Sequence, residues 1–191
     1  MRPVLLFNHP NSIIKKGESL MEFMELLRKR YSVRKFSDRP LEPEKLRQLL
    51  DAGNLAPTAR NIQPQRVYVL QSEGALAKIN ALSPCVFGAK TVLVFAYDAN
   101  EEWKNPLEEG VHSGVEDVSI AATQVMLCAT TLGLGTCWCN YFPNSKLEEA
   151  FGFPEQERAV LFMPIGYPAE DAEPSPMHEK RKALEETVRY L

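Results

Sequence analysis

The sequence lacks both a secretion signal and an apolar run long enough to cross a membrane. The apolar run near its start, Val4 to Phe7, is too short for the hydrophobic region of a signal peptide, and no small-residue cleavage site follows it. The longest apolar stretch, Val118 to Cys137, is interrupted by polar residues such as Ser119 and Gln124, which favours a buried helix over a membrane span. We therefore expect a soluble protein of the cytoplasm with no membrane partner.

Cysteine and histidine are scarce, and their spacing suits neither disulfides nor a metal site. The three histidines are isolated from one another in the sequence. The four cysteines are Cys85, Cys128, Cys137 and Cys139. Structural zinc sites need ligands at characteristic spacings, and disulfide-rich secreted domains need a regular cysteine framework. We therefore expect reduced, packed thiols and no bound metal.

The chain also lacks an excess of positive charge. Its 25 acidic side chains outnumber 22 lysines and arginines, which leaves a net charge of −3. Because proteins that coat nucleic acid neutralise phosphates with a basic surface, we expect no nucleic-acid partner. Hydrophobic residues make up 45% and charged residues 25% of the chain, as in folded globular proteins. We interpret residues 1–18 as an N-terminal extension and residues 19–191 as a single domain.

Common nucleotide-binding and hydrolase motifs are missing or incomplete. Gly133 and Gly135 begin like a dinucleotide-binding fingerprint, but Trp138 occupies the third glycine position, and a helix rather than a strand is expected before them. Segment 88–91 lacks the adjacent Gly-Lys pair of a P-loop, and the sequence has no nucleophile elbow of an esterase. These classes of enzyme are therefore disfavoured.

Hydrophobic periodicity and capping residues predict five helices and three strands. The helices are expected at 19–31, from about 43 to 54, and at 75–82, 115–132 and 144–151. The strands are expected at 66–71, 90–97 and 158–165. The strand at 90–97 is apolar on both faces, which is typical of a central strand. Because the helices outnumber the strands and do not alternate regularly with them, the pattern favours the α+β class.

Positive charge is concentrated in residues 28–35. Five cationic side chains and a serine lie within these eight residues, where the first helix gives way to extended chain. Arg30, Ser32 and Arg34 alternate, so in an extended chain they lie on one side and can bind a phosphate together. A solvated basic helix end that complements the helix dipole is an alternative explanation. A second basic cluster, at 180–182, could bind the same anion, and a basic tail explains it equally well.

Five short segments follow one another in an order that matches a known family. They are Arg30-x-Ser32-x-Arg34-x-Phe36; Ala56-Pro57-Thr58-x-x-Asn61-x-Gln63-Pro64; Gln124 and Leu127 leading into Leu132-Gly133-Leu134-Gly135-Thr136-x-Trp138; Pro164-Ile165-Gly166-Tyr167-Pro168; and Lys180-Arg181-Lys182-x-Leu184-Glu185-Glu186. Together they closely resemble the nitroreductase family of FMN-dependent oxidoreductases. The resemblance extends over about residues 21 to 191, and the common order of the segments makes it specific.

The resemblance implies which residues bind the phosphate end of FMN. Arg30, Ser32 and Arg34 match the family residues that bind the phosphate and the ribityl chain. Arg181 matches the C-terminal arginine that completes the phosphate site, and Gly135 matches a segment whose backbone passes close to the cofactor. None of these residues is implied to be a catalytic acid or base.

The resemblance also implies a homodimer in which each FMN site contains residues of both subunits. Pro57, Thr58 and Asn61 match a loop that reaches the flavin from the neighbouring subunit, and Gln63 of the same motif is expected to bind the cofactor with them. The implied fold is an α+β sandwich with a mainly antiparallel central sheet flanked by helices. The apolar helix expected at 115–132 fits a helix packed against both its own sheet and the partner.

The reaction implied by the resemblance is a flavin-mediated hydride transfer. NADH or NADPH would deliver a hydride to N5 of FMN, and a nitroaromatic, a quinone or a similar small electrophile would then take its place, which gives ping-pong kinetics. A non-enzymatic flavin-binding protein for storage or sensing remains an alternative, as does a specialised flavin enzyme of the same family. One departure from the family pattern is Gln65, which stands where the family often has tryptophan or another aromatic residue.

Overall fold

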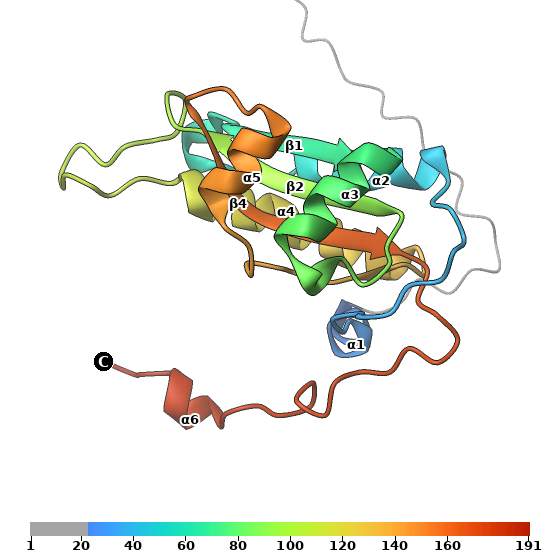
Figure 1. Ribbon diagram of the computed structural model, residues 1–191. Helices are drawn as coiled ribbons and strands as arrows, with labels where there is room; N and C mark the ends of the chain where they lie inside the picture. Colours follow the sequence, from blue (N-terminus) through green and yellow to red (C-terminus); the bar gives the residue numbers. More distant parts are fainter. Residues whose placement is uncertain (1–22) are drawn as a thin grey trace, which may run out of the picture.

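Four strands form a single antiparallel sheet at the centre of the computed structural model, which describes residues 23–191 (Figure 1). Their spatial order is β1 (Gln65–Leu70), β2 (Thr91–Asp98), β4 (Glu157–Gly166) and β3 (Gly135–Thr136). Each neighbouring pair of strands is antiparallel. The strands β2 and β4 are therefore the inner strands of the sheet.

The two inner strands are apolar on both faces, which suits their position. All eight residues of β2 are buried, and β4 is buried without interruption from Leu161 to Gly166. The register pairs Phe95 with Leu161, and an irregularity follows between Phe95 and Ala96. The prediction of a central strand in this part of the chain is confirmed.

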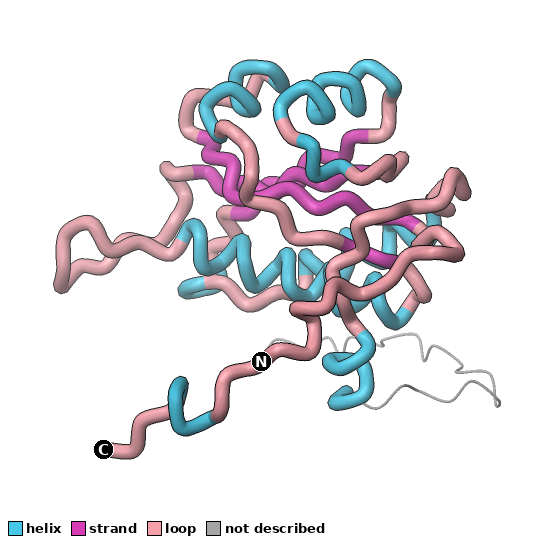
Figure 2. The backbone as a smooth tube through the Cα atoms, turned by 60° about the horizontal axis from the view of Figure 1, so that its bottom comes forward, coloured by secondary structure: helices cyan, strands magenta, loops and turns pink. Residues whose placement is uncertain are grey.

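Helices cover both faces of the sheet, so the fold has three layers (Figure 2). The helices on one face are α3 (Glu73–Leu82) and α5 (Asn144–Phe151). Those on the other face are α2 (Pro43–Asn54) and the long α4 (Gly114–Thr131). Because side chains of a strand alternate between its faces, β2 contributes to both cores. Val92 packs with Ile79 of α3, whereas Leu93 and Phe95 pack with Val125 of α4.

Local sequence signals explain where these helices begin and end. Pro43 occupies the first turn of α2, where its missing N–H leaves no intrahelical bond unmade. The Ser72 hydroxyl accepts the N–H of Ala75 and caps α3. Gly133 and Gly152 adopt left-handed φ angles of 72° and 64° just past α4 and α5. Within residues 23–191, no helix combines the length and apolarity needed to span a membrane.

The expected α+β class with an antiparallel sheet is confirmed. Four of the five expected helices appear with boundaries shifted by at most two residues. The first expected helix is described as α1 (Phe23–Lys29); its expected start, like the N-terminal extension 1–18, lies outside the described residues. Sequence periodicity missed β3 and the short α6 (Leu184–Thr187) because elements of two and four residues show no period.

Two segments extend away from the three layers (Figures 1 and 2). The connection between β2 and α4 projects as a hairpin in which Lys104 bridges to His112 and the side chain of Leu107 is exposed. The tail after β4 runs past α1 and ends beyond α6, with Leu184 and Tyr190 exposed. A single copy of the chain thus leaves apolar side chains of its tail uncovered.

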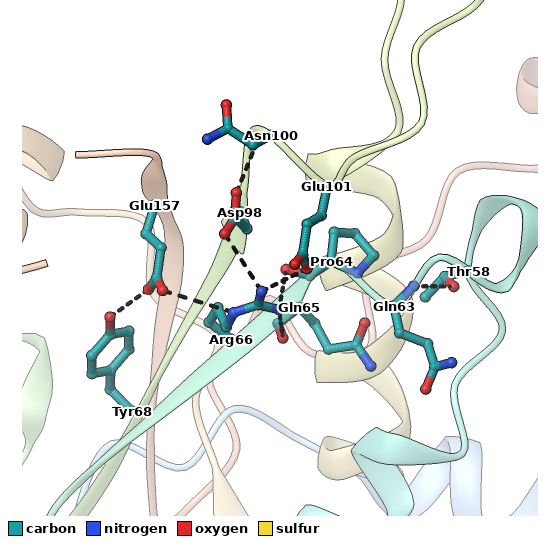
Figure 3. Close-up of polar contacts among 10 residues, drawn as sticks. All are labelled: Thr58, Gln63, Pro64, Gln65, Arg66, Tyr68, Asp98, Asn100, Glu101 and Glu157. Carbon is teal, nitrogen blue, oxygen red and sulfur yellow. Dashed lines mark hydrogen bonds and ion pairs between the residues drawn. The ribbon is translucent and has the colours of Figure 1, made fainter. Parts of the chain in front are cut away.

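Arg66 ties three strands together at one end of the sheet (Figure 3). Its guanidinium on β1 lies 2.6 Å from the carboxylate of Glu101, 3.5 Å from Asp98 at the end of β2 and 3.8 Å from Glu157 at the start of β4. Glu157 is buried and also accepts the hydroxyl of Tyr68. The hydrogen bond to Glu101 is the main cause that raises the pKa of Arg66, and burial is the main cause that raises the pKa of Tyr68.

Replacing Arg66 with leucine should lower the free energy of unfolding by about 1–3 kcal/mol, because the buried carboxylates of Asp98 and Glu157 lose their cation. Urea denaturation of the purified variant measures this change. Arg47→Leu is the matched control, since Arg47 forms only an exposed pair with Asp51 on α2. Equal unfolding midpoints for the two variants would contradict this role of Arg66.

Candidate cofactor site

Three arginines from distant parts of the chain meet around one surface hollow. Arg30 and Arg34 follow α1, and Arg181 comes from the C-terminal tail. The hollow, called here the basic hollow, has a volume of about 280 Å³ and is lined by Arg30, Ser32, Arg34, Ser175, Met177, His178 and Arg181. The predicted phosphate-binding residues Arg30, Ser32, Arg34 and Arg181 are thus brought together.

None of the ion pairs formed among residues 23–191 involves the arginines of the basic hollow. Arg34 donates to the carbonyl of Ser32 at 3.3 Å, and Arg181 donates to the carbonyls of His178 and Lys180. These guanidiniums therefore keep most of their N–H donors for another anion. Guanidinium groups bind phosphate through charge-assisted, often bidentate hydrogen bonds.

The extended segment at residues 32–34 runs beside the sheet and positions Ser32 and Arg34 at the basic hollow. Val33 is buried, and its N–H donates to the carbonyl of Thr136 at 2.9 Å. Ser32 forms a parallel bridge with Thr136, so the segment continues the sheet beyond β3. Because side chains alternate along an extended chain, burying Val33 turns Ser32 and Arg34 together toward the hollow. This is the alternation expected from the sequence.

Gly135 allows the extended segment to approach this closely. A Cβ atom at Gly135 would lie 2.5 Å from Cγ2 of Val33, a distance that real Cβ contacts do not show. Gly135 therefore lies directly behind the strand that carries Ser32 and Arg34. Gly135 does not line the basic hollow itself, but lines a neighbouring hollow together with Arg30. Its proximity to the cofactor stays a prediction.

The C-terminal tail is fastened over the same region by three contacts. Asp171 pairs with Lys35, the carbonyl of Ala172 accepts the hydroxyl of Tyr31 at 3.3 Å, and His178 lies 3.4 Å from the carbonyl of Arg28. These contacts bring three lining residues that sequence reasoning missed, Ser175, Met177 and His178, to the hollow. Their position just before the basic cluster at 180–182 was the available signal.

A cysteine pair lies beneath the basic hollow. The pKa of Cys137 is lowered from 9 to about 7, chiefly by a hydrogen bond from Cys139 and further by Arg34, Ser32 and Arg30, although burial opposes the shift. The same hydrogen bond and burial raise the pKa of Cys139. Both cysteines are free and buried, as predicted for packed thiols. The Cys137 thiol therefore reports the positive potential of the basic hollow.

Arg34→Ala should raise the pKa of Cys137, because it removes a nearby positive charge. Folding lowers this pKa, so the thiolate contributes to stability fully above pH 9, and this contribution disappears as the pH falls through about 7. The ultraviolet absorbance of the thiolate, measured against pH in FMN-free protein and corrected with Cys137→Ser, gives the pKa. Lys35→Ala is the control, since Lys35 pairs with Asp171 instead. Unchanged titration in Arg34→Ala would refute the proximity of this charge.

The loop at residues 57–63 has a constrained backbone. Arg60, Asn61 and Gln63 have φ angles of 53°, 56° and 60°, in the left-handed region that residues other than glycine rarely adopt. Two hydrogen bonds close the loop on Thr58: its carbonyl accepts the N–H of Asn61 at 2.9 Å, and its hydroxyl accepts the N–H of Gln63 at 3.0 Å. Such backbone strain persists only where the surroundings impose it.

A buried carboxylate fixes this loop to α4. Asp117 is 3% exposed; its Oδ1 accepts the N–H of Ala59 at 2.8 Å, and its Oδ2 accepts the hydroxyl of Ser113 at 2.7 Å. Sequence reasoning missed Asp117. The sequence did contain a signal for its burial, because Asp117 stands beside Val118 on the apolar face of a helix. A buried carboxylate needs hydrogen-bond partners.

Asp117→Ala should lower the free energy of unfolding by about 1–3 kcal/mol, because it leaves the N–H of Ala59 and the Ser113 hydroxyl without their buried acceptor. Amide hydrogen exchange of the loop at 57–63 should also become faster. Urea denaturation and exchange mass spectrometry measure the two effects. Glu116→Ala, an exposed carboxylate in the same helical turn, is the control. A loop that exchanges equally slowly in both variants would argue against the anchor.

The predicted site residues fall into two groups at opposite ends of α4. Arg30, Ser32, Arg34, Gly135 and Arg181 gather near the end of α4, since Gly133 closes that helix. The predicted loop residues belong to the segment anchored at its start, and they are Pro57, Thr58, Asn61 and Gln63. The helix between the two groups rises about 20 Å. One copy of the chain does not bring all the predicted residues together.

Comparison with known proteins identifies the family. The model of the nitroreductase family matches residues 27–85 and 80–167. The chain belongs to the nitroreductase family. The prediction that it is an enzyme of the nitroreductase type is thereby confirmed.

Individual nitroreductase-family members agree in sequence and fold. A protein of Methanothermobacter thermautotrophicus named NADH dehydrogenase/NAD(P)H nitroreductase is 31% identical over 160 residues, which cover 80% of this chain and 81% of that protein. The crystal structure of a nitroreductase family protein from Clostridium difficile has a TM-score of 0.83 at 35% identity and covers 89% of this chain and 98% of its own. A nitroreductase of Exiguobacterium sibiricum, solved in complex with FMN, shares the fold with a TM-score of 0.76 at 21% identity, over 91% of this chain and 99% of its own.

Proposed function

We propose that this nitroreductase-family protein is an FMN-dependent oxidoreductase that transfers hydride from NADH or NADPH to small conjugated electrophiles. The observation that carries the proposal is the basic hollow, where Arg30, Arg34 and Arg181 meet and form no ion pair with a carboxylate of residues 23–191. A relative is named for NAD(P)H nitroreductase activity, and a protein of the same fold was solved with FMN. These names support the choice of reductant and cofactor.

The residues of the basic hollow fit the terminal phosphate of FMN. That group is a dianion near neutral pH, and the guanidiniums of Arg30, Arg34 and Arg181 with the Ser32 hydroxyl offer convergent donors for its oxygens. Gly135, which carries no side chain, leaves room for Val33, and this contact holds the segment that presents Ser32 and Arg34 to the phosphate. FMN, when bound, would supply the redox chemistry by accepting a hydride at N5 and passing it to the acceptor.

The separation of the two groups of predicted residues supports a homodimer as the working unit. The loop with Pro57, Thr58, Asn61 and Gln63 cannot reach the basic hollow of its own chain while Asp117 anchors it to the far end of α4. In the proposed dimer this loop orients the flavin bound by the partner. Its strained, hydrogen-bonded backbone would hold the contact without reorganisation.

The proposed reaction needs no dedicated acid or base from this chain. The residues bind and orient the cofactor, exclude water and hold positive charge near the phosphate, while reductant and acceptor occupy the same place in turn. Expected acceptors are nitroaromatics, quinones and similar conjugated electrophiles.

Anaerobic titration tests the proposed function. The purified protein should be yellow, and its flavin absorbance should bleach on addition of NADH or NADPH. The absorbance should recover on addition of a nitroaromatic. A yellow protein that neither nicotinamide bleaches would instead favour flavin storage or sensing, or another reductant. A colourless protein that does not take up added FMN would reject every flavin-dependent function.

The double variant Arg30→Ala/Arg34→Ala should bind FMN at least tenfold more weakly than the wild type, because two charged donors to the phosphate are removed. The variant should keep its fold. Fluorescence quenching of added FMN measures the affinity, and circular dichroism monitors the fold. Arg47→Ala/Lys146→Ala, which removes two exposed cations elsewhere, is the control. FMN affinity equal to that of the control would refute the phosphate site.

A further inference from the structure

The side chains of residues 23–191 that line the basic hollow include one histidine, His178. Histidine is the side chain that ordinarily gains a proton between about pH 8 and 5. The other lining side chains are three arginines, which stay charged, and two serines and a methionine, which do not ionise in this range. Among these lining side chains, His178 is therefore the one that can change the charge of the hollow near neutral pH.

The tail holds His178 in a defined position beside Arg181. The half-buried ring of His178 lies edge-on against the ring of Tyr31, with their centroids 6.2 Å apart. Its backbone N–H donates to the carbonyl of Ser175 at 2.7 Å, and its carbonyl accepts the guanidinium of Arg181. The turn at 175–181 therefore presents His178 and Arg181 to the hollow as one unit, where the tail runs past α1 (Figure 1).

A backbone carbonyl determines which ring nitrogen of His178 carries a hydrogen. Nε2 lies 3.4 Å from the carbonyl oxygen of Arg28. Because a carbonyl oxygen only accepts hydrogen bonds, Nε2 is the donor in this contact. In the neutral ring Nδ1 is then an acceptor, whereas in the protonated ring Nδ1 is a second donor. An unprotonated phosphate oxygen can therefore pair with Nδ1 only when the ring is protonated.

Positive charge dominates around His178. The charged or titratable side chains on the segments that meet there are Arg28, Arg30, Tyr31 and Arg34 of α1 and the chain after it, Cys137 beneath them, and Glu179 and Arg181 of the tail. The three arginines of the hollow by themselves oppose protonation of the imidazole, and a phosphate dianion between them favours it. Binding of a phosphate and binding of a proton to His178 therefore strengthen each other.

We propose that His178, in its protonated form, is a fourth cationic ligand of the FMN phosphate and makes retention of FMN dependent on pH. This inference rests on the proposed function, since it assigns the phosphate of FMN to the basic hollow. The protein would take up a proton at His178 as it binds the cofactor. The sign follows from this linkage: raising the pH removes the proton, and with it a charged donor, so the affinity for FMN falls.

The affinity for FMN, measured by fluorescence quenching between pH 6 and 8.5, tests the proposal in the full-length wild type and in His178→Gln. Glutamine keeps a donor for the Arg28 carbonyl but cannot gain charge. Both proteins share Cys137, the three arginines and the titration of FMN itself, so the ratio of their affinities isolates His178. The wild type should bind FMN about tenfold more tightly than His178→Gln at pH 6, and the two affinities should converge at pH 8.5.

A second variant and a second ligand serve as controls. His178→Lys, which stays charged over this range, should bind FMN more tightly than His178→Gln at both ends of it. Riboflavin, which lacks the phosphate, should bind to the wild type and both variants equally, and circular dichroism monitors their fold.

Two outcomes would overturn the role of His178 while leaving the proposed function intact. One is an affinity ratio for FMN that does not change with pH, and the other is an equal loss of FMN and riboflavin affinity in His178→Gln. A wild type that binds FMN at no pH would instead reject the proposed function, and this inference with it.

Discussion

The packing of α4 on the sheet fixes both halves of the candidate site. Val118 and Val125 are fully or almost fully buried against β2 and β4, so the helix has a defined position and direction. At its start Asp117 anchors the loop at 57–63, and past its end the chain turns at Gly133 into β3. Because a helix is stiff, these two regions are separated by its length and cannot adjust independently. The proposed site would therefore combine these two regions from two copies of the chain.

The two halves are prepared in different ways. At one end, Val33 is inserted against Gly135, so Ser32 and Arg34 are presented by a strand whose position the sheet determines. At the other end, the loop carries three left-handed residues that its hydrogen bonds to Thr58 and Asp117 hold in place. Both arrangements restrict side chains before a ligand binds, which reduces the entropy lost on binding.

The sequence predicted the parts of the fold that have a local cause. Apolar runs, Pro43 and Gly133 mark helices and strands that the structure contains within two residues. No local sequence signal brings Arg181 close to Arg30. Their proximity depends on the contact of the tail with Tyr31 and on the path of the chain after β4. Charge patterning suggested it as one of two explanations of the cluster at 180–182, and the resemblance to the family selected Arg181. The role of Asp117 was not predictable, since it depends on which loop faces the start of α4.

The distribution of carboxylates explains how a chain of net charge −3 keeps a positive hollow. Glu157 and Asp98 lie against Arg66, and Asp117 holds the loop at 57–63. Glu42 accepts the hydroxyl of Tyr167 and pairs with Arg39, and these contacts lower the pKa of Glu42 to about 2. None of these acidic side chains lines the basic hollow. Because an opposite charge a few ångströms away cancels most of the field of a guanidinium, the placement of carboxylates elsewhere matters as much as the arginines themselves. Net charge alone therefore argued against a nucleic-acid surface but carried no information about a site for one phosphate.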